Sequence, residues 1–160
     1  GKYQKLHFFA KEHLYFNPGD NGLPVFDFRG VKIGILICFD WVFPEVWRNL
    51  ALQGVDLICH PSNIVLPYAQ SVIPSHSIIN RVFIALANRI GTEHDLTFSG
   101  NSIVSNPNGK IIGSLSKTNE EVLTLDINTN ESKAKMLTDD NHVFDDRRLD
   151  IYCDLSKIKR

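Results

Sequence analysis

An apolar run over Val31–Cys38, interrupted only by Lys32, is a strong pattern in the first third of the chain. A run that lacks polar alternation predicts a strand buried on both faces of a sheet. A proline follows at Pro44, where the first turn of a helix tolerates it, and Gly54 provides a stop signal. These signals predict a helix over Pro44–Gln53. Its core-facing stripe consists of apolar residues four positions apart, which are Val46 with Leu50 and Trp47 with Ala51.

The alternation of strand and helix continues after this helix. Val55–His60 is predicted to be a second buried strand, closed by the loop Pro61-Ser62-Asn63. A second helix is predicted to begin near Pro74 and to lead into a strand over Val82–Ala87. From Thr138 onward the chain is polar and is predicted to be an arm, so the fold class is α/β. Later strands are predicted over Asn101–Ser105, Lys110–Leu115 and Glu121–Ile127, with an Asn-Gly turn between the first two.

Composition narrows the class of protein. The 160 residues are 43% hydrophobic and 22% charged, with a net charge of −1, which is typical of one ordinary globular domain. This balance gives no basic surface for a nucleic acid, and no stretch approaches the ~20 apolar residues of a membrane span. The first twenty residues also lack the layout of a signal peptide. We therefore expect a cytoplasmic protein with no nucleic-acid or membrane partner.

Three cysteines, at positions 38, 59 and 153, indicate neither a disulfide framework nor a metal site, because their number is odd and no short C-x-x-C spacing occurs. No metal and no cofactor is predicted. Cys38 stands at the carboxyl end of a predicted buried strand and just before a helix, which is where open α/β sheets carry their chemistry. A nearby helix N-terminus or an ammonium such as that of Lys5 favours the nucleophilic thiolate. The alternative is that Cys38 is a small buried hydrophobe.

Several segments around this cysteine resemble the nitrilase superfamily of carbon-nitrogen hydrolases. The resemblance extends over about residues 2 to 152, and the cysteine segment is its most specific part. The matching segments are Tyr3-Gln4-Lys5-Leu6-His7, Tyr15-Phe16-Asn17-Pro18-Gly19-Asp20, Ile37-Cys38-Phe39-Asp40 through Phe43-Pro44-Glu45 and Arg48, Asn88-Arg89, Ser99-Gly100-Asn101-Ser102 and Pro107-Asn108-Gly109-Lys110.

The resemblance implies a Glu-Lys-Cys mechanism. Cys38 would attack an amide carbonyl and form a thioester, which water then hydrolyses. The Lys5 ammonium and the backbone N–H of Phe39 would hold the oxyanion, and Glu12 matches an auxiliary glutamate that orients the lysine or the substrate. The alternative for Glu12 is a solvated charge beside Lys11.

The family's general-base glutamate lies well upstream of the lysine, whereas this sequence begins four residues before Lys5. The family fold is a four-layer α-β-β-α sandwich, so we expect that its amino-terminal part is absent from this chain. Residues 1–152 would form a partial hydrolase domain and 153–160 a polar C-terminal tail. Apolar faces left uncovered would be buried by the remainder of a longer product or by a partner subunit. Family members typically dimerise, so a homo-oligomer, a dimer or higher, is expected.

Four further residues are candidates for substrate binding. Trp41 could form an aromatic wall beside the thiol or simply pack in the core. His60 is at a strand end that could line the substrate pocket, although it could equally be structural. Ser62 and Asn63 occupy the loop where the resemblance places substrate contacts.

The pair Phe39-Asp40 after the cysteine resembles amidases and carbamoylases, whereas nitrile hydrolases usually have Trp-Glu there. The predicted function is therefore hydrolysis of a small non-peptide amide or carbamoyl amide. The alternative is a truncated or non-catalytic subunit with a structural role.

Overall fold

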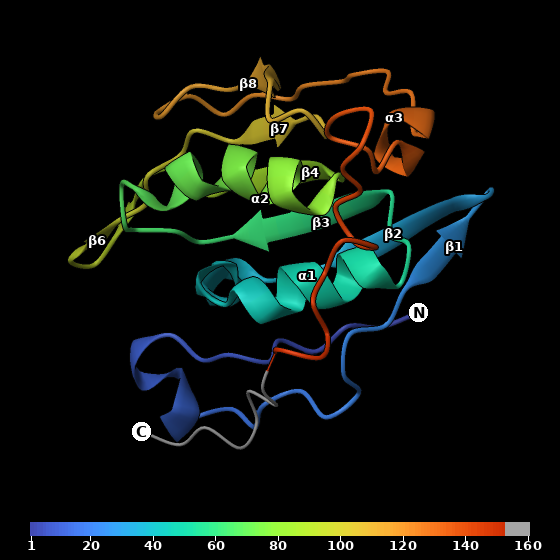
Figure 1. The fold of residues 1–160 in the computed structure, drawn as a ribbon. Coiled ribbons are helices and arrows are strands. Elements are labelled where there is room, and N and C mark those ends of the chain that lie inside the picture. Colours follow the sequence, from blue (N-terminus) through green and yellow to red (C-terminus); the bar gives the residue numbers. More distant parts are fainter. Residues whose placement is uncertain (153–160) are drawn as a thin grey trace.

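A mixed six-stranded sheet forms the centre of the computed structural model, which describes residues 1–152 (Figure 1). The strand order is β1-β2-β3-β4-β7-β8; β2, β3 and β4 run parallel, and the other neighbours are antiparallel. The strands of this sheet are β1 (Phe26–Phe28), β2 (Val31–Ile35), β3 (Leu57–Ser62), β4 (Phe83–Asn88), β7 (Ile103–Ser105) and β8 (Ile111–Ser114). A separate hairpin consists of β5 (Thr92–Glu93) and β6 (Leu96–Thr97).

Helices α1 (Pro44–Leu52) and α2 (Ile73–Asn80) lie next to each other along one face of the sheet (Figure 1). Both confirm the sequence prediction, because each begins at or next to a proline. Gly54 follows α1 with φ +82°, a left-handed conformation that glycine adopts without steric cost. The shorter helical segments are α3 (Asn130–Lys133) and three 3₁₀ turns, η1 (Ala10–Leu14), η2 (Cys38–Val42) and η3 (Ala69–Val72).

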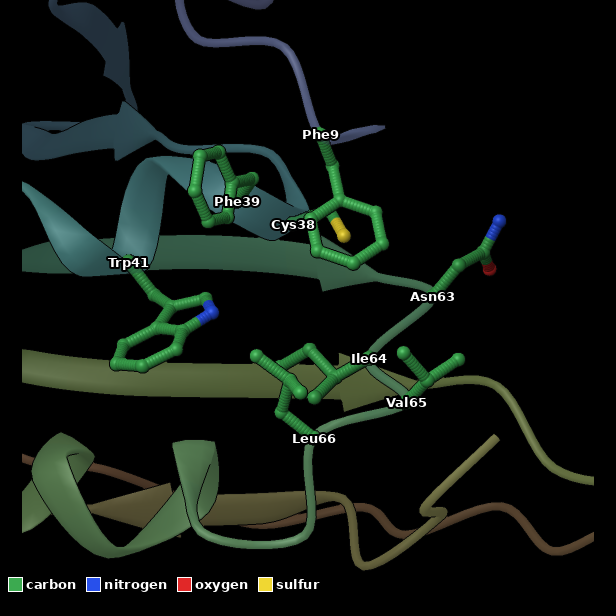
Figure 2. Close-up of a pocket in the computed structure, with 8 residues that line it drawn as sticks. All are labelled: Phe9, Cys38, Phe39, Trp41, Asn63, Ile64, Val65 and Leu66. Carbon is green, nitrogen blue, oxygen red and sulfur yellow. The ribbon is translucent and has the colours of Figure 1, made fainter. Parts of the chain in front are cut away.

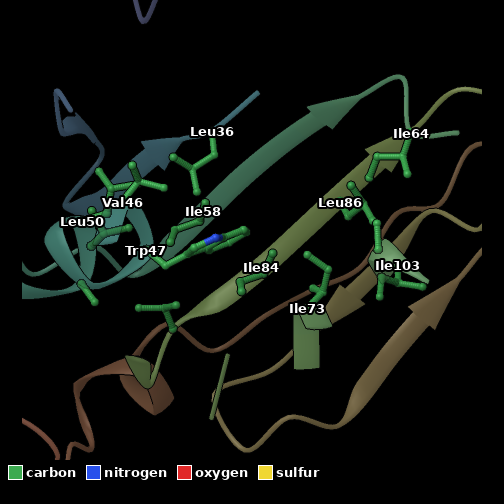
Figure 3. Packing of buried hydrophobic residues seen from close by; sticks show 14 residues of the cluster. Leu36, Val46, Trp47, Leu50, Ile58, Ile64, Ile73, Ile84, Leu86 and Ile103 are labelled. Atoms are coloured by element: carbon green, nitrogen blue, oxygen red, sulfur yellow. The ribbon is translucent and has the colours of Figure 1, made fainter. Parts of the chain in front are cut away.

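The hydrophobic core fills the space between these two helices and the sheet, and Trp47 of α1 lies in its middle (Figure 3). Trp47 is fully buried, and its indole N–H donates to the carbonyl of Trp41 at 3.2 Å. The other buried members of the cluster are Leu36, Val46, Leu50, Ala51, Val55, Ile58, Ile64, Ala69, Ile73, Val82, Ile84, Leu86 and Ile103. α1 therefore fixes the position of the turn that carries Cys38, because that turn runs directly into the helix.

Side chains of β3 alternate between two environments. Ile58, His60 and Ser62 are buried, whereas Leu57 and Cys59 are half-buried. The buried set belongs to the core cluster's side of the sheet, so the opposite side of β3 is the less covered one. The four-layer sandwich expected for the family stays a prediction, because among the described residues α1 and α2 pack on one face of a single large sheet.

Each predicted strand that forms is shifted or shortened by one to three residues at one or both ends, and two of these differences lie next to Cys38. β2 ends at Ile35 rather than at Cys38, because the chain turns away after Leu36 donates its last ladder hydrogen bond to the Cys59 carbonyl at 3.1 Å. β3 continues through Pro61, which the sequence had assigned to a loop. Pro61 lacks an N–H, but its backbone faces the side that β2 has already left, so no ladder bond is lost there.

The predicted strand over Glu121–Ile127 was wrong: this segment joins no ladder among residues 1–152. Its alternating pattern instead reflects one-sided packing, since the side chains of Leu123 and Leu125 lie where a β-carbon on Gly113 would be. The polar segment after Thr138 is an arm anchored by Phe144, whose ring packs against the core cluster. The predicted tail, 153–160, lies outside the described residues.

The β1 edge of the sheet is short and charged. Asp27 faces Lys32 across the antiparallel pair, and the connecting turn contains Arg29 at φ +54°. The Arg29 guanidinium lies 5.4 Å from the centroid of the exposed Phe28 ring. No helix among residues 1–152 is both long and apolar enough to cross a membrane.

Candidate active site

Cys38 occupies a sharp turn at the carboxyl end of the parallel strands. It opens the 3₁₀ turn η2 directly before α1, and its φ of +46° is left-handed, which is uncommon for a residue with a side chain. The sequence predicted this address, although not the backbone conformation. The N–H of the next residue, Phe39, has no hydrogen-bond partner within residues 1–152.

The Cys38 side chain lines a pocket with mostly apolar walls (Figure 2). Of the residues predicted for the site, Phe39, Trp41 and Asn63 share this pocket with it. The remaining walls are Phe9, Ile64, Val65 and Leu66, which the sequence analysis missed. A carbonyl group that enters the pocket would lie next to Cys38 and Phe39.

The buried carboxylate of Asp40 joins the amino-terminal segment to the cysteine turn. Its Oδ2 accepts hydrogen bonds from the Tyr3 hydroxyl at 2.7 Å and the Ile37 N–H at 2.9 Å. Its Oδ1 accepts from the His7 N–H at 3.2 Å, and the His7 ring Nδ1 lies 2.8 Å from the same oxygen. Burial, then the hydrogen bond and charge of Asp40, raise the pKa of Tyr3, so this hydroxyl stays protonated and donates. In the sequence, Lys5 lies between Tyr3 and His7, the two amino-terminal residues that bond to Asp40.

Lys5 and Glu12, both predicted for the site, form an ion pair between Nζ and Oε2. The Lys5 side chain is only 16% exposed, so the pair is shielded from solvent on the lysine side. The same Glu12 oxygen accepts the Phe9 N–H at 2.9 Å, which closes the turn η1 and orients the carboxylate. Both residues line a second hollow with Gln4 and Phe8, next in sequence to the Phe9 wall of the cysteine pocket.

His60 and Ser62 occupy positions behind the pocket rather than in its lining. Both side chains point from β3 into the buried side, because alternate residues of a strand share a face. His60 Nε2 lies 2.9 Å from the Cys38 carbonyl oxygen, and the Ser62 hydroxyl donates to the His60 carbonyl at 3.3 Å. Burial lowers the pKa of His60 to about 4, so its ring is neutral near pH 7.

Cys59, the other described cysteine, lies on the less covered side of β3, and burial raises the pKa of its thiol. Within residues 1–152 no three His, Cys, Asp or Glu side chains are grouped so that they could hold a metal ion. The pocket residues that sequence reasoning missed, Phe9, Ile64, Val65 and Leu66, left no local signal. Asp40 lies outside the pocket lining. Its place three residues after the N-cap residue Ile37 is where a carboxylate can accept the N-cap N–H, which is one half of a capping box.

Comparison with known proteins gives a consistent family match. The model of the family described as carbon-nitrogen hydrolase matches residues 1–135. A nitrilase of Pyrococcus abyssi (strain GE5 / Orsay) is 43% identical over 152 residues, which cover 95% of this chain and 58% of the relative. An N-carbamoylputrescine amidase of Solanum tuberosum is 33% identical over 177 residues, covering 95% of this chain and 57% of the relative.

Solved structures agree with the sequence matches. A mutant of the amidase from Nesterenkonia sp. AN1, which shows Michael addition of acrylamide at its active-site cysteine, superposes with a TM-score of 0.68 at 31% identity. The match covers 72% of this chain and 47% of that chain. The chain thus spans between about half and three fifths of the proteins that it matches.

Proposed function

The chain belongs to the carbon-nitrogen hydrolase family, and on that premise we propose that it supplies the cysteine nucleophile of an enzyme that hydrolyses small non-peptide amides. The observation that carries the proposal is Cys38 itself. Its thiol lines an apolar pocket from a left-handed turn at the carboxyl end of a parallel strand pair. A buried structural cysteine has no need of either the turn or the pocket.

In the proposed reaction, the Cys38 sulfur attacks the amide carbon and the carbonyl oxygen becomes an oxyanion. Collapse of this tetrahedral intermediate expels the amine or ammonia with a proton and leaves a thioester, which water hydrolyses to the acid and the free thiol. The Phe39 N–H, which has no protein partner within residues 1–152, and the Lys5 ammonium are the proposed oxyanion donors. Each such donor contributes about 3 kcal/mol to lowering the barrier.

Glu12 is proposed to hold Lys5 rather than to react with substrate. Its carboxylate is already bonded to the Lys5 ammonium and to the Phe9 N–H, so it fixes the direction of the lysine side chain. Asn63 and Trp41 are the proposed substrate contacts, since both line the pocket. Ser62 and His60 support this site from behind it.

No carboxylate is among the described residues that line the cysteine pocket. We therefore propose that the base that takes the thiol proton belongs to the remainder of a longer protein or to a partner subunit. The same source would complete the four-layer sandwich and cover the exposed side of β3. In this proposal residues 1–152 are one part of a hydrolase domain that works as a homo-oligomer.

The missing carboxylate also supports a second candidate, a nitrilase-fold subunit that no longer catalyses and acts as a structural partner. Two features favour the hydrolase. Relatives include a protein named N-carbamoylputrescine amidase, and the matching Nesterenkonia amidase binds acrylamide covalently at its cysteine. The pair Phe39-Asp40 also fits the amide-cleaving rather than the nitrile-cleaving branch.

Ammonia release from simple aliphatic amides and carbamoyl amides tests the proposal. The assay compares the full natural gene product with its Cys38→Ala and Cys59→Ala variants. We expect turnover to vanish in the first variant and to persist in the second, because Cys59 lies on the other side of β3.

A second measurement distinguishes the two candidates on the 160-residue chain alone. Iodoacetamide at pH 7 should alkylate Cys38 much faster than Cys59, whose pKa is raised by burial. Turnover that survives Cys38→Ala would contradict the assignment of the nucleophile. A Cys38 as slow as Cys59 would favour the non-catalytic subunit.

A further inference from the structure

The backbone at Cys38 needs a specific restraint. A residue with a β-carbon avoids φ near +46°, so the turn persists only where its surroundings hold it. On the amino-terminal side, the Asp40 carboxylate accepts the Ile37 N–H and fixes the entry to the turn. On the carboxyl-terminal side, the atom to be fixed is the carbonyl oxygen of Cys38.

The Cys38 carbonyl lies beyond the end of the β2–β3 ladder. The β2–β3 ladder pairs Ile35 with Cys59, and its last hydrogen bond runs from the Leu36 N–H to the Cys59 carbonyl. Beyond this point β2 leaves β3, and a side chain of β3 replaces the backbone as partner. His60, the next residue of β3, reaches the Cys38 oxygen with Nε2 at 2.9 Å.

The protonation of this ring follows from its contacts. A carbonyl oxygen only accepts hydrogen bonds, so Nε2 carries the proton and donates. Nδ1 is buried and has no partner within residues 1–152. A neutral ring with its single proton on Nε2 satisfies both facts.

The ring is also held in place by packing. Trp47 of α1 meets it edge to face, with centroids 5.4 Å apart and an interplanar angle of 89°. Trp47 is restrained in turn, because its ring stacks on the His76 ring of α2 with the ring centroids 4.6 Å apart. His60 is fully buried, so neither water nor substrate competes for its N–H.

We propose that His60 is a positioning residue for the nucleophile: its Nε2–H holds the Cys38 carbonyl, and thereby keeps the thiol directed into the pocket and the Phe39 N–H open. This inference rests on the proposed function of Cys38. His60 touches no reacting atom, so it acts only through the geometry of the turn.

Three variants test the proposal on the full natural gene product. His60→Gln keeps an N–H donor at a similar reach, His60→Asn keeps the amide but is one methylene shorter, and His60→Leu removes the donor. The readout is the rate of iodoacetamide alkylation at pH 7, followed for each cysteine separately by peptide mass. Cys59 serves as the control within every sample, because it is next to His60 but faces the other side of β3, and general unfolding would expose it.

We expect His60→Leu and His60→Asn to slow alkylation of Cys38 by about tenfold or more, since a released turn no longer holds the thiol beside the Phe39 N–H and the start of α1, the surroundings that make a cysteine reactive. Cys59 should keep its rate, and His60→Gln should stay within about threefold of the parent chain. A folded Leu or Asn variant with a parental Cys38 rate would overturn the proposal.

If neither the Leu nor the Asn variant folds, the Gln variant alone decides: a Cys38 slowed as much as expected for donor loss would overturn the proposal, and a near-parental rate would support it. Failure of the proposed function looks different. In that case Cys38 of the parent chain would react no faster than Cys59, before any change at His60.

Discussion

The Asp40→Asn substitution tests how the amino-terminal segment is attached to the cysteine turn. Asp40 is fully buried, and each of its two oxygens accepts one backbone N–H, from Ile37 on one side and His7 on the other. An asparagine has only one carbonyl oxygen, so in either orientation its NH₂ group faces a backbone N–H that cannot accept. One buried donor then lacks an acceptor, which costs about 1–3 kcal/mol, and the remaining bonds lose the assistance of the charge.

We therefore expect Asp40→Asn to lower the free energy of unfolding by about 3 kcal/mol. Asp27→Asn is the matched control: Asp27 is exposed and, within residues 1–152, accepts only the Gly30 N–H at 3.1 Å, so the substitution should cost no more than about 0.5 kcal/mol. Urea unfolding at pH 7, followed by tryptophan fluorescence, measures both. Equal stability of the two variants would refute the role of Asp40 as the anchor of the segment that carries Lys5.

Three further predictions concern the packed surroundings of the site. Burial lowers the pKa of His60 from about 6.5 to about 4, so between these pH values the native state binds fewer protons than the unfolded state and the free energy of unfolding falls as the pH falls. At pH 4.5 this residue should account for a loss of about 2–3 kcal/mol, and urea unfolding should find that loss reduced in His60→Gln. Gly100 and Gly22 are both left-handed, but only a β-carbon on Gly100 would collide with the Lys117 backbone, so Gly100→Ala should cost at least about 1 kcal/mol more than Gly22→Ala, and equal midpoints of thermal unfolding would contradict this. Trp47→Ala should remove about 3–5 kcal/mol of stability by leaving a cavity between α1 and the sheet, whereas a loss below about 1 kcal/mol in urea would mean that the core refills.

Features set by neighbouring residues were predictable from the sequence. The bounds of α1 followed from Pro44 and Gly54, whose effects on the backbone are local. The position of Cys38 at a strand end followed from the end of an apolar run. The strand predicted at 121–127 does not form. Alternation of apolar and polar residues indicates that one side of a segment is buried, but not that its backbone pairs with another strand, and here Leu123 packs on β8 without ladder hydrogen bonds.

In the site, too, the sequence predicts what neighbouring residues determine and misses what distant contacts determine. Cys38, Phe39 and Trp41 share a pocket because they are sequence neighbours in one turn, which the sequence could predict. For His60 the sequence leaves a pocket role and a structural role open, because it does not show which face of β3 the side chain joins; the structure places it on the buried face. The link from Tyr3 to Asp40 spans 37 positions, and no local pattern signals a contact at that separation.

The β1 edge has a consequence for self-association. An exposed edge strand is a template on which another chain can add a strand and begin aggregation. Here the edge offers only three residues, one of them the charged Asp27, and ends in a left-handed turn at Arg29. Such a short, charged and strongly turned border gives an incoming strand too few unpaired groups to bind. Growth by sheet extension at this border should therefore be suppressed even at high concentration.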